Sequence, residues 1–159
     1  MIRVLAILAA YRAFTSATPA MPPPPTEPPC GHPLMKQMFE QIFNEENGWD
    51  VKTNCDAVPK ATQLLKDYLN NNLQVSSPYE GKWCVKTAKR STANAPQHAG
   101  DGVRTLFHMI DGSIDNLKDA DKSREIGCTT GGRMTNREAN HKFESALVCL
   151  IELKAGESC

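Results

Sequence analysis

The six cysteines are the residues of this 159-residue chain that could do the widest range of chemistry. A free thiolate can attack a substrate or bind a metal ion, whereas a paired cysteine only crosslinks the chain. No C-x-x-C pair occurs, so the spacing supports neither a zinc ribbon nor a thioredoxin-type redox pair. An even number of cysteines in an oxidising compartment predicts three disulfides. The six positions are Cys30, Cys55, Cys84, Cys128, Cys149 and Cys159.

The other side chains form no recognisable catalytic pattern. The serines lack a Gly-x-Ser-x-Gly elbow, and neither common glycine-rich phosphate-binding motif occurs. A catalytic or metal-binding histidine needs partners beside it, and the spacing of the four histidines does not supply them. We therefore predict no catalytic residue, no cofactor and no metal site. The histidines are His32, His98, His108 and His141.

The first 29 residues predict export followed by a spacer. A basic start at Arg3, the apolar run Val4–Ala10 and small residues up to Ala17 are the parts of a secretory signal peptide, which we assign to residues 1–17. Residues 18–29 are rich in proline, a composition that favours extended polyproline II and a semi-rigid spacer. We expect residues 30–159 to form a single domain.

Charge and the C-terminal sequence narrow the choice of partner. The chain has 18 basic and 18 acidic side chains, and loss of Arg3 and Arg12 with the signal peptide leaves 16 basic and 18 acidic ones, a formal charge of −2. This balance provides no electrostatic reason to bind nucleic acid or an anionic membrane surface.

No hydrophobic tail ends the sequence, so we expect a secreted, extracellular protein without a membrane anchor.

Three segments have the apolar spacing of amphipathic helices. The first runs from Pro33, which a first helical turn tolerates, to Gly48, where a helix would stop. The second begins at Asp56, a predicted N-cap, and ends near Asn71. The third covers residues 103–110. The apolar stripe of the first helix consists of Met35, Met38, Phe39, Ile42 and Phe43.

Three further segments predict strands, at residues 82–87, 125–130 and 146–151. The last is a continuous apolar run, as expected of a central strand covered on both faces. We expect Gly131-Gly132 to break the second strand and residues 133–142 to form a long polar connection. Helices and strands in this order predict an α+β fold, with helices packed on a small antiparallel sheet.

Two local predictions accompany this fold. Residues 113–123 contain few apolar side chains among many charges, which suggests a weak, exposed helix or a structured loop. Cys128 and Cys149 both lie in the middle of strands of the proposed hairpin, where the cross-strand spacing suits a bridge, so we predict that they form a disulfide. The partners of the other four cysteines stay open.

Several short segments, taken in order, resemble the CAP superfamily of cysteine-rich secretory, antigen 5 and pathogenesis-related 1 proteins. They are similar above all to the activation-associated secreted proteins of parasitic nematodes; coccidian surface antigens with a CAP-like fold are a second resemblance. The resemblance implies an α-β-α sandwich over about residues 30 to 153. The segments are Phe43-Asn44, Trp49-Asp50, Cys55-Asp56, Leu106-Phe107-His108-Met109, Ile126-Gly127-Cys128 and Leu147-Val148-Cys149-Leu150.

The sequence departs from this family at the cleft that commonly binds a metal ion. Thr105 stands where the family has a histidine, His108 stands at a glutamine position, and Phe43 replaces the histidine of a His-Asn pair. If the fold is that of the family, the departures imply that the metal chemistry of the cleft has been lost.

The resemblance implies a secreted, non-enzymatic interaction protein, released by a parasite, that acts on host proteins or cells in immune or haemostatic modulation. The alternative is an extracellular lipid- or sterol-binding protein, with the Met/Phe stripe of the first helix lining an apolar cleft. A metal-dependent hydrolase or peptidase is a third, less supported class. A basic run contributes a further surface, either a solvated face or a contact for a glycan or acidic protein; it contains Lys82, Lys86, Lys89 and Arg90.

Overall fold

The computed structural model describes residues 30–76, 78–93, 99–117, 123–137 and 140–159. The predicted signal peptide and proline-rich spacer lie outside the described residues. Among the described helices, none is long and apolar enough to cross a membrane.

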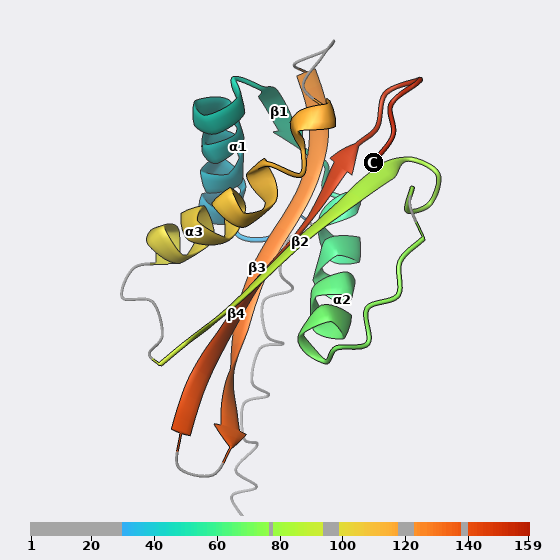
Figure 1. Ribbon diagram of the computed structural model, residues 1–159. Coiled ribbons are helices and arrows are strands. Elements are labelled where there is room, and N and C mark those ends of the chain that lie inside the picture. Colours follow the sequence, from blue (N-terminus) through green and yellow to red (C-terminus); the bar gives the residue numbers. More distant parts are fainter. Residues whose placement is uncertain (1–29, 77, 94–98, 118–122, 138–139) are drawn as a thin grey trace, which may run out of the picture.

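A four-stranded sheet lies between helices on its two faces (Figure 1), which confirms the α+β fold class and the α-β-α arrangement. The strand order is β1-β3-β4-β2, so β3 and β4 form the centre of the sheet. In chain order the elements are α1 (Pro33–Asn47), β1 (Asp50–Thr53), α2 (Ala57–Leu69), β2 (Trp83–Thr92), α3 (Ala99–Asp111), a 3₁₀ turn (Asp115–Leu117), β3 (Ser123–Arg137) and β4 (Asn140–Glu152).

Three of the strands are antiparallel, as predicted, and β1 is the exception. β4 pairs antiparallel with β3 on one side and with β2 on the other, whereas β1 pairs parallel with β3, from Asp50↔Ser123 to Thr53↔Ile126. No strand was predicted from the sequence at the position of β1. Of its four residues only Val51 is buried, so no alternating pattern marks it as a strand.

Each face of the sheet has its own apolar core. On one face α1 and α3 cover the sheet, and Phe43 stacks on Trp49 at 5.7 Å between ring centroids and meets the Phe107 ring edge-on at 4.8 Å. On the other face α2 packs against β3 and β4, with Leu64 and Leu65 among the buried side chains. The predicted stripe of α1 is therefore mostly a core stripe, since its last three members are buried.

The prediction that Gly131-Gly132 breaks β3 is wrong. Both strands of the hairpin continue past the glycines to Arg137↔Asn140, and their far ends extend beyond the helices (Figure 1). A Cβ atom on Gly131 would lie 3.0 Å from Leu65 Cδ2, and one on Gly132 would overlap the Phe143 ring. The glycines thus make room for neighbouring side chains within a continuous strand.

Two other local predictions change. Residues 113–123 were expected to form a weak, exposed helix or a structured loop. Asp115–Leu117 form the 3₁₀ turn, and Ile114 and Leu117 are buried rather than exposed, while residues 118–122 lie outside the described part. Asp56 precedes α2 but makes no side-chain capping bond. Instead Asn54 Oδ1 accepts hydrogen bonds from the backbone N–H groups of Asp56, at 2.9 Å, and Ala57, at 3.0 Å.

All six cysteines are paired. Cys128 is bonded to Cys149 across β3 and β4, as the sequence predicted. Cys30 is bonded to Cys55 and thereby ties the start of α1 to the turn before α2. The third bridge joins Cys84 of β2 to Cys159 at the C-terminus, which holds the last residues of the chain against the sheet.

Arg124 of β3 is a buried cation, and its side chain is fully inaccessible to solvent. Its guanidinium forms an ion pair with Glu157 and donates hydrogen bonds to the backbone oxygens of Leu117 and of Glu152, the latter at 2.9 Å. It also lies over the Trp49 ring, 5.0 Å from the ring centroid. One side chain therefore connects the sheet, the 3₁₀ turn and the C-terminal segment.

This ion pair predicts that stability falls in acid. Arg124 lowers the pKa of Glu157 below 4.5, its ordinary value, and the backbone N–H of Lys154 adds to the effect. Because the pKa is lower in the folded chain, the contribution is complete above about pH 4.5 and is lost as the pH falls through the folded pKa. Urea unfolding midpoints measured from pH 7 down to pH 3 should show this loss, and Glu157→Gln should flatten the curve. An unchanged pH profile in that variant would mean that other carboxylates cause the acid sensitivity.

Candidate functional site

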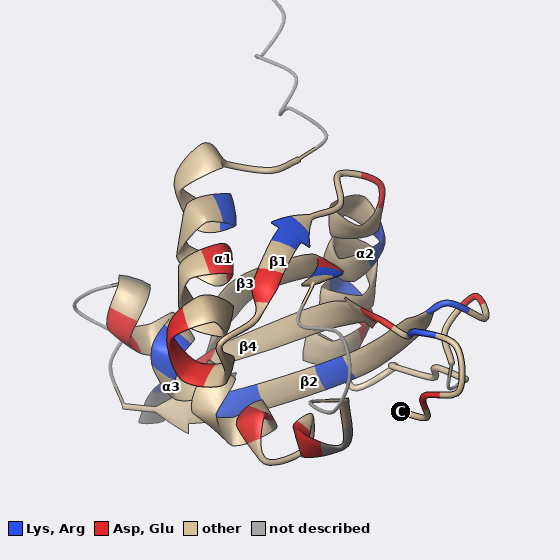
Figure 2. Cartoon of the chain, turned by 90° about the horizontal axis from the view of Figure 1, so that it is seen from above, with Lys and Arg blue, Asp and Glu red and all other residues tan. Residues whose placement is uncertain are grey.

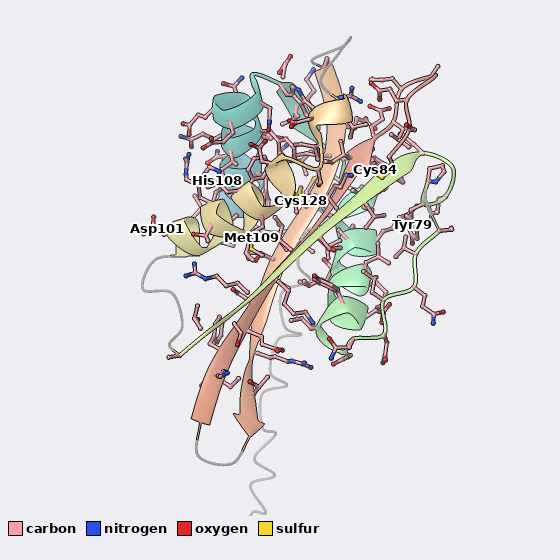
Figure 3. The ribbon with its side chains drawn as sticks, in the orientation of Figure 1. Tyr79, Cys84, Asp101, His108, Met109 and Cys128 are labelled. Carbon is pink, nitrogen blue, oxygen red and sulfur yellow. A yellow bond between two sulfur atoms is a disulfide. The ribbon has the colours of Figure 1, made fainter. Side chains whose placement is uncertain are left out.

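The three residues that the family resemblance places in a cleft do not meet in the structure. Phe43 is fully buried among aromatic rings, whereas His108 is exposed on α3 (Figure 3). Thr105, one turn earlier on the same helix, donates a hydrogen bond from Oγ1 to the backbone oxygen of Asp101 at 2.8 Å. Phe43 therefore belongs to the core, and the two α3 residues to the surface.

Of the other three histidines, only His32 has a side chain that the structure describes. His32 precedes α1, and its Nδ1 accepts a hydrogen bond of 3.3 Å from the backbone N–H of Leu34, so it caps the helix. His98 and the side chain of His141 lie outside the described residues. Within the described part of the chain, no three histidine, cysteine, aspartate or glutamate residues gather as they would around a metal ion.

The basic run starts at Lys82, directly before β2, and continues along this edge strand (Figure 2). Half of its cations already have partners. Lys82 forms an ion pair of 3.0 Å with Glu125. Lys89 donates hydrogen bonds to the Tyr68 backbone oxygen, at 2.9 Å, and to Asn71. Partial burial lowers the pKa of Lys86, and Arg90 is exposed. Much of this charge thus serves to fasten β2 to its neighbours.

A pocket of about 200 Å³ opens between α1, α2 and β3, and we call it the α1–α2 pocket. It lies beside the central strand β3, at the edge of the sheet where β1 has ended. Cys128, which lies on β3 near the middle of the sheet (Figure 3), forms part of its floor. The lining residues are Cys30, Gly31, His32, Met35, Lys36, Phe39, Thr53, Val58, Thr62, Cys128, Thr129 and Thr130.

The lining combines apolar side chains with hydroxyl groups. Met35, Phe39 and Val58 supply the apolar part. Two of the hydroxyls bond to the backbone, because Thr62 Oγ1 donates to the oxygen of Val58 at 2.9 Å and Thr130 Oγ1 donates to the oxygen of Ala146 at 2.8 Å. A third hydroxyl, Thr53 Oγ1, is buried and has no hydrogen-bond partner among the described residues.

Charge at the pocket has one sign. Lys36, in the first turns of α1, lines the pocket, and no aspartate or glutamate does so. No ion pair joins Lys36 to another described residue. A group with a carboxylate would therefore meet a free cation at this pocket.

The walls of the α1–α2 pocket are held in place by bonds outside it. The Cys30–Cys55 disulfide joins the start of α1 to the turn before α2. Glu40 of α1 accepts a hydrogen bond of 2.8 Å from the backbone N–H of Thr53, which fixes α1 against the outer edge of β1. The two helices are thus attached to β1 and to each other, and the opening between them is built into the fold.

Some of the lining residues of the α1–α2 pocket carry a signal in the sequence. Met35 and Phe39 belong to the predicted apolar stripe, and Cys30 and Cys128 were predicted to form disulfides. Lys36 and Thr53 gave no signal, because a single lysine on a helix and a single threonine in an unpredicted strand are common in any sequence. They become a site only when the fold brings them to one opening.

No protein-family model matches the chain, and no curated protein matches it. A solved structure named "Manganese-bound Ac-ASP-7" is similar to it, with a TM-score of 0.42 and 16% sequence identity. The matched region covers 77% of this chain and 65% of that one, so the chain spans less than two thirds of that protein's length. A similarity of this size assigns neither a family nor an activity.

Proposed function

We propose that the chain is a secreted, non-enzymatic interaction protein, a divergent member of the CAP superfamily that acts on host proteins or cells in immune or haemostatic modulation. The sequence resemblance suggests the family and the host-directed role. The observation that carries the extracellular part of the proposal is the pairing of all six cysteines in three disulfides. Such bridges form and persist in oxidising compartments and are rare in the cytosol.

The fold supports a binding role through the α1–α2 pocket. Its walls are fixed by a disulfide and by the Glu40–Thr53 hydrogen bond, so a partner would meet a preformed surface. A preformed site lowers the entropy that binding must otherwise overcome.

Capture from blood plasma and from leukocyte lysate tests this proposal. The oxidised, secreted chain is immobilised, and bound proteins are quantified by mass spectrometry against a reduced and alkylated sample of the same chain. We expect at least one host protein to bind the oxidised chain saturably and to be lost from the reduced control. Equal recovery on both samples, or no saturable binding, would contradict an interaction role.

A second candidate function is carriage of a lipid or sterol, favoured by the apolar lining that Met35, Phe39 and Val58 give the α1–α2 pocket. Met35 and Phe39 belong to the Met/Phe stripe of the first helix, which the lipid-binding alternative placed along an apolar cleft. Val58 comes from α2. Native mass spectrometry of the protein purified from a eukaryotic secretion system should then show copurifying lipid. A single mass equal to that of the protein alone, with no lipid in an organic extract, would remove this candidate.

A further inference from the structure

The backbone of β3 is open toward the α1–α2 pocket. The backbone N–H of Asn54 donates a hydrogen bond of 2.7 Å to the backbone oxygen of Ile126, so the main chain of Ile126 faces β1. Every second residue of a strand directs its N–H and C=O to the same side. The main-chain groups of Cys128 and Thr130 therefore face the same edge as Ile126.

The hairpin geometry supports this assignment independently. The Cα atoms of Cys128 and Cys149 are 4.1 Å apart. Directly opposed antiparallel residues come this close, about 4.5 Å, only in non-hydrogen-bonded pairs, whose N–H and C=O groups face away from the partner strand. The main chain of Cys128 thus faces away from β4 and toward the pocket.

The described residues leave this stretch of edge without a neighbouring strand. β1 pairs with β3 only as far as Ile126, while Cys128, Thr129 and Thr130 line the pocket beyond it. By contrast, the outer edge of β1 itself is closed, because Glu40 accepts the hydrogen bond of the Thr53 N–H. Main-chain donors and acceptors of a central strand therefore line the opening between α1 and α2 without a described strand beside them.

The pocket's polar groups favour a peptide over an acyl chain. An acyl chain in the pocket would cover the main-chain groups at the β3 edge without bonding to them, and burial of unpaired polar groups is unfavourable. An extended peptide would supply both donors and acceptors to the edge and place alternate side chains against Met35 and Phe39. Lys36, with no acidic residue near it in the lining, selects for a carboxylate on that peptide.

We propose that an extended, acidic segment of the partner protein adds to β3 as a strand beyond the end of β1. Its main chain bonds to Cys128 and Thr130, and a carboxylate lies at Lys36. This inference rests on the proposed interaction role and specifies its site and the chemistry of the partner.

Selection of a phage-displayed library of random dodecapeptides on the oxidised, secreted chain tests the inference. We expect enriched peptides to carry aspartate or glutamate, and a synthetic copy of the most enriched one to bind at least tenfold more weakly to Lys36→Glu. A glutamate near the start of α1 is favourable for the helix, so this variant keeps the fold. Lys66→Glu, an equal change of charge at an exposed position on α2, is the control and should bind the peptide as the parent does.

A second variant and a second readout examine the strand itself. Thr130→Pro removes an N–H that faces the open edge, a position where strands tolerate proline, and should abolish peptide binding. Hydrogen exchange on the parent chain tests the same strand pairing without a variant. The bound peptide should slow exchange of the Cys128 and Thr130 amides at least tenfold relative to the free chain.

Each alternative has its own signature. Slow exchange of those two amides before peptide is added would mean that the chain's own N-terminal residues or a second copy cover the edge, which overturns the inference. Unchanged peptide affinity in Lys36→Glu, failure to enrich any peptide, or displacement of the peptide by palmitate would also overturn it. If Lys36→Glu still captures the plasma partner, the interaction role stands and only the strand site fails.

Discussion

Replacing Arg124 with methionine is expected to lower the free energy of unfolding by about 3–5 kcal/mol, the usual cost of removing one member of a buried ion pair. Methionine fills a similar volume but leaves Glu157 without its cation and leaves the backbone oxygens of Leu117 and Glu152 without their donor. The stacking of the guanidinium over Trp49 is lost as well.

Chemical denaturation at neutral pH measures this effect, and Arg133→Met is the matched control. Arg133 forms a 2.8 Å ion pair with Glu144, but its side chain is 36% exposed. Exposed pairs contribute less than about 1 kcal/mol, so the control should unfold close to the parent. Equal losses in the two variants would show that burial of Arg124 adds nothing to its ion pair.

Removal of the Cys84–Cys159 disulfide is expected to destabilise the chain more than removal of the Cys30–Cys55 disulfide. The double substitution Cys84→Ala with Cys159→Ala opens a loop with a sequence separation of 75 residues, against 25 for Cys30–Cys55. In the chain-entropy description the longer loop contributes about 4 kcal/mol, roughly 1 kcal/mol more than the shorter one. The bridge also anchors the segment that carries Glu157 to Arg124.

Urea unfolding of this variant and of the double variant Cys30→Ala with Cys55→Ala, each compared with the oxidised parent, provides the measurement. The structure also predicts that Arg124→Met costs less in the chain that lacks Cys84–Cys159 than in the parent, because the released tail no longer holds Glu157 in place. A larger loss from Cys30–Cys55 removal, or strict additivity with Arg124→Met, would contradict this account of the C-terminal segment.

Helices were the part of the fold that the sequence predicted best. Pro33 and Gly48 mark the ends of α1, and the stripe through Phe39 and Phe43 shows which side is buried. Gly48 has a φ of 66°, a left-handed conformation that ends a helix at little cost for glycine. Such signals lie within the helix and at its ends, so they can be recognised without knowledge of the rest of the fold.

Strands were predicted only where they cross the core. The predicted run 146–151 is apolar because helices cover it on both faces. The strand β4 itself is longer and already begins at Asn140. Where β3 and β4 extend past the helices, Arg133 and Met134 are partly or well exposed, so the hydrophobic pattern that identifies a strand is absent. The glycines beside them were then misread as a break.

The candidate site depends on tertiary arrangement and could be predicted only in fragments. The disulfide between Cys128 and Cys149 could be predicted because both cysteines lie in neighbouring strands of one hairpin. The Cys30–Cys55 disulfide could be predicted only with knowledge of how the chain runs from α1 to α2. The open edge of β3 exists because β1 ends at Thr53, and no residue type signals the length of a partner strand.

The proposed function requires an exported chain held by three disulfides, and the intact mass of the secreted product tests this requirement most directly. The full-length chain is expressed in cultured eukaryotic cells, and the medium is analysed with and without reduction. We expect a product that lacks the first 17 to 20 residues and gains the mass of six hydrogens on reduction, with non-reduced peptides linking Cys30 to Cys55, Cys84 to Cys159 and Cys128 to Cys149. Retention of the uncleaved chain inside the cell with free thiols would contradict the account.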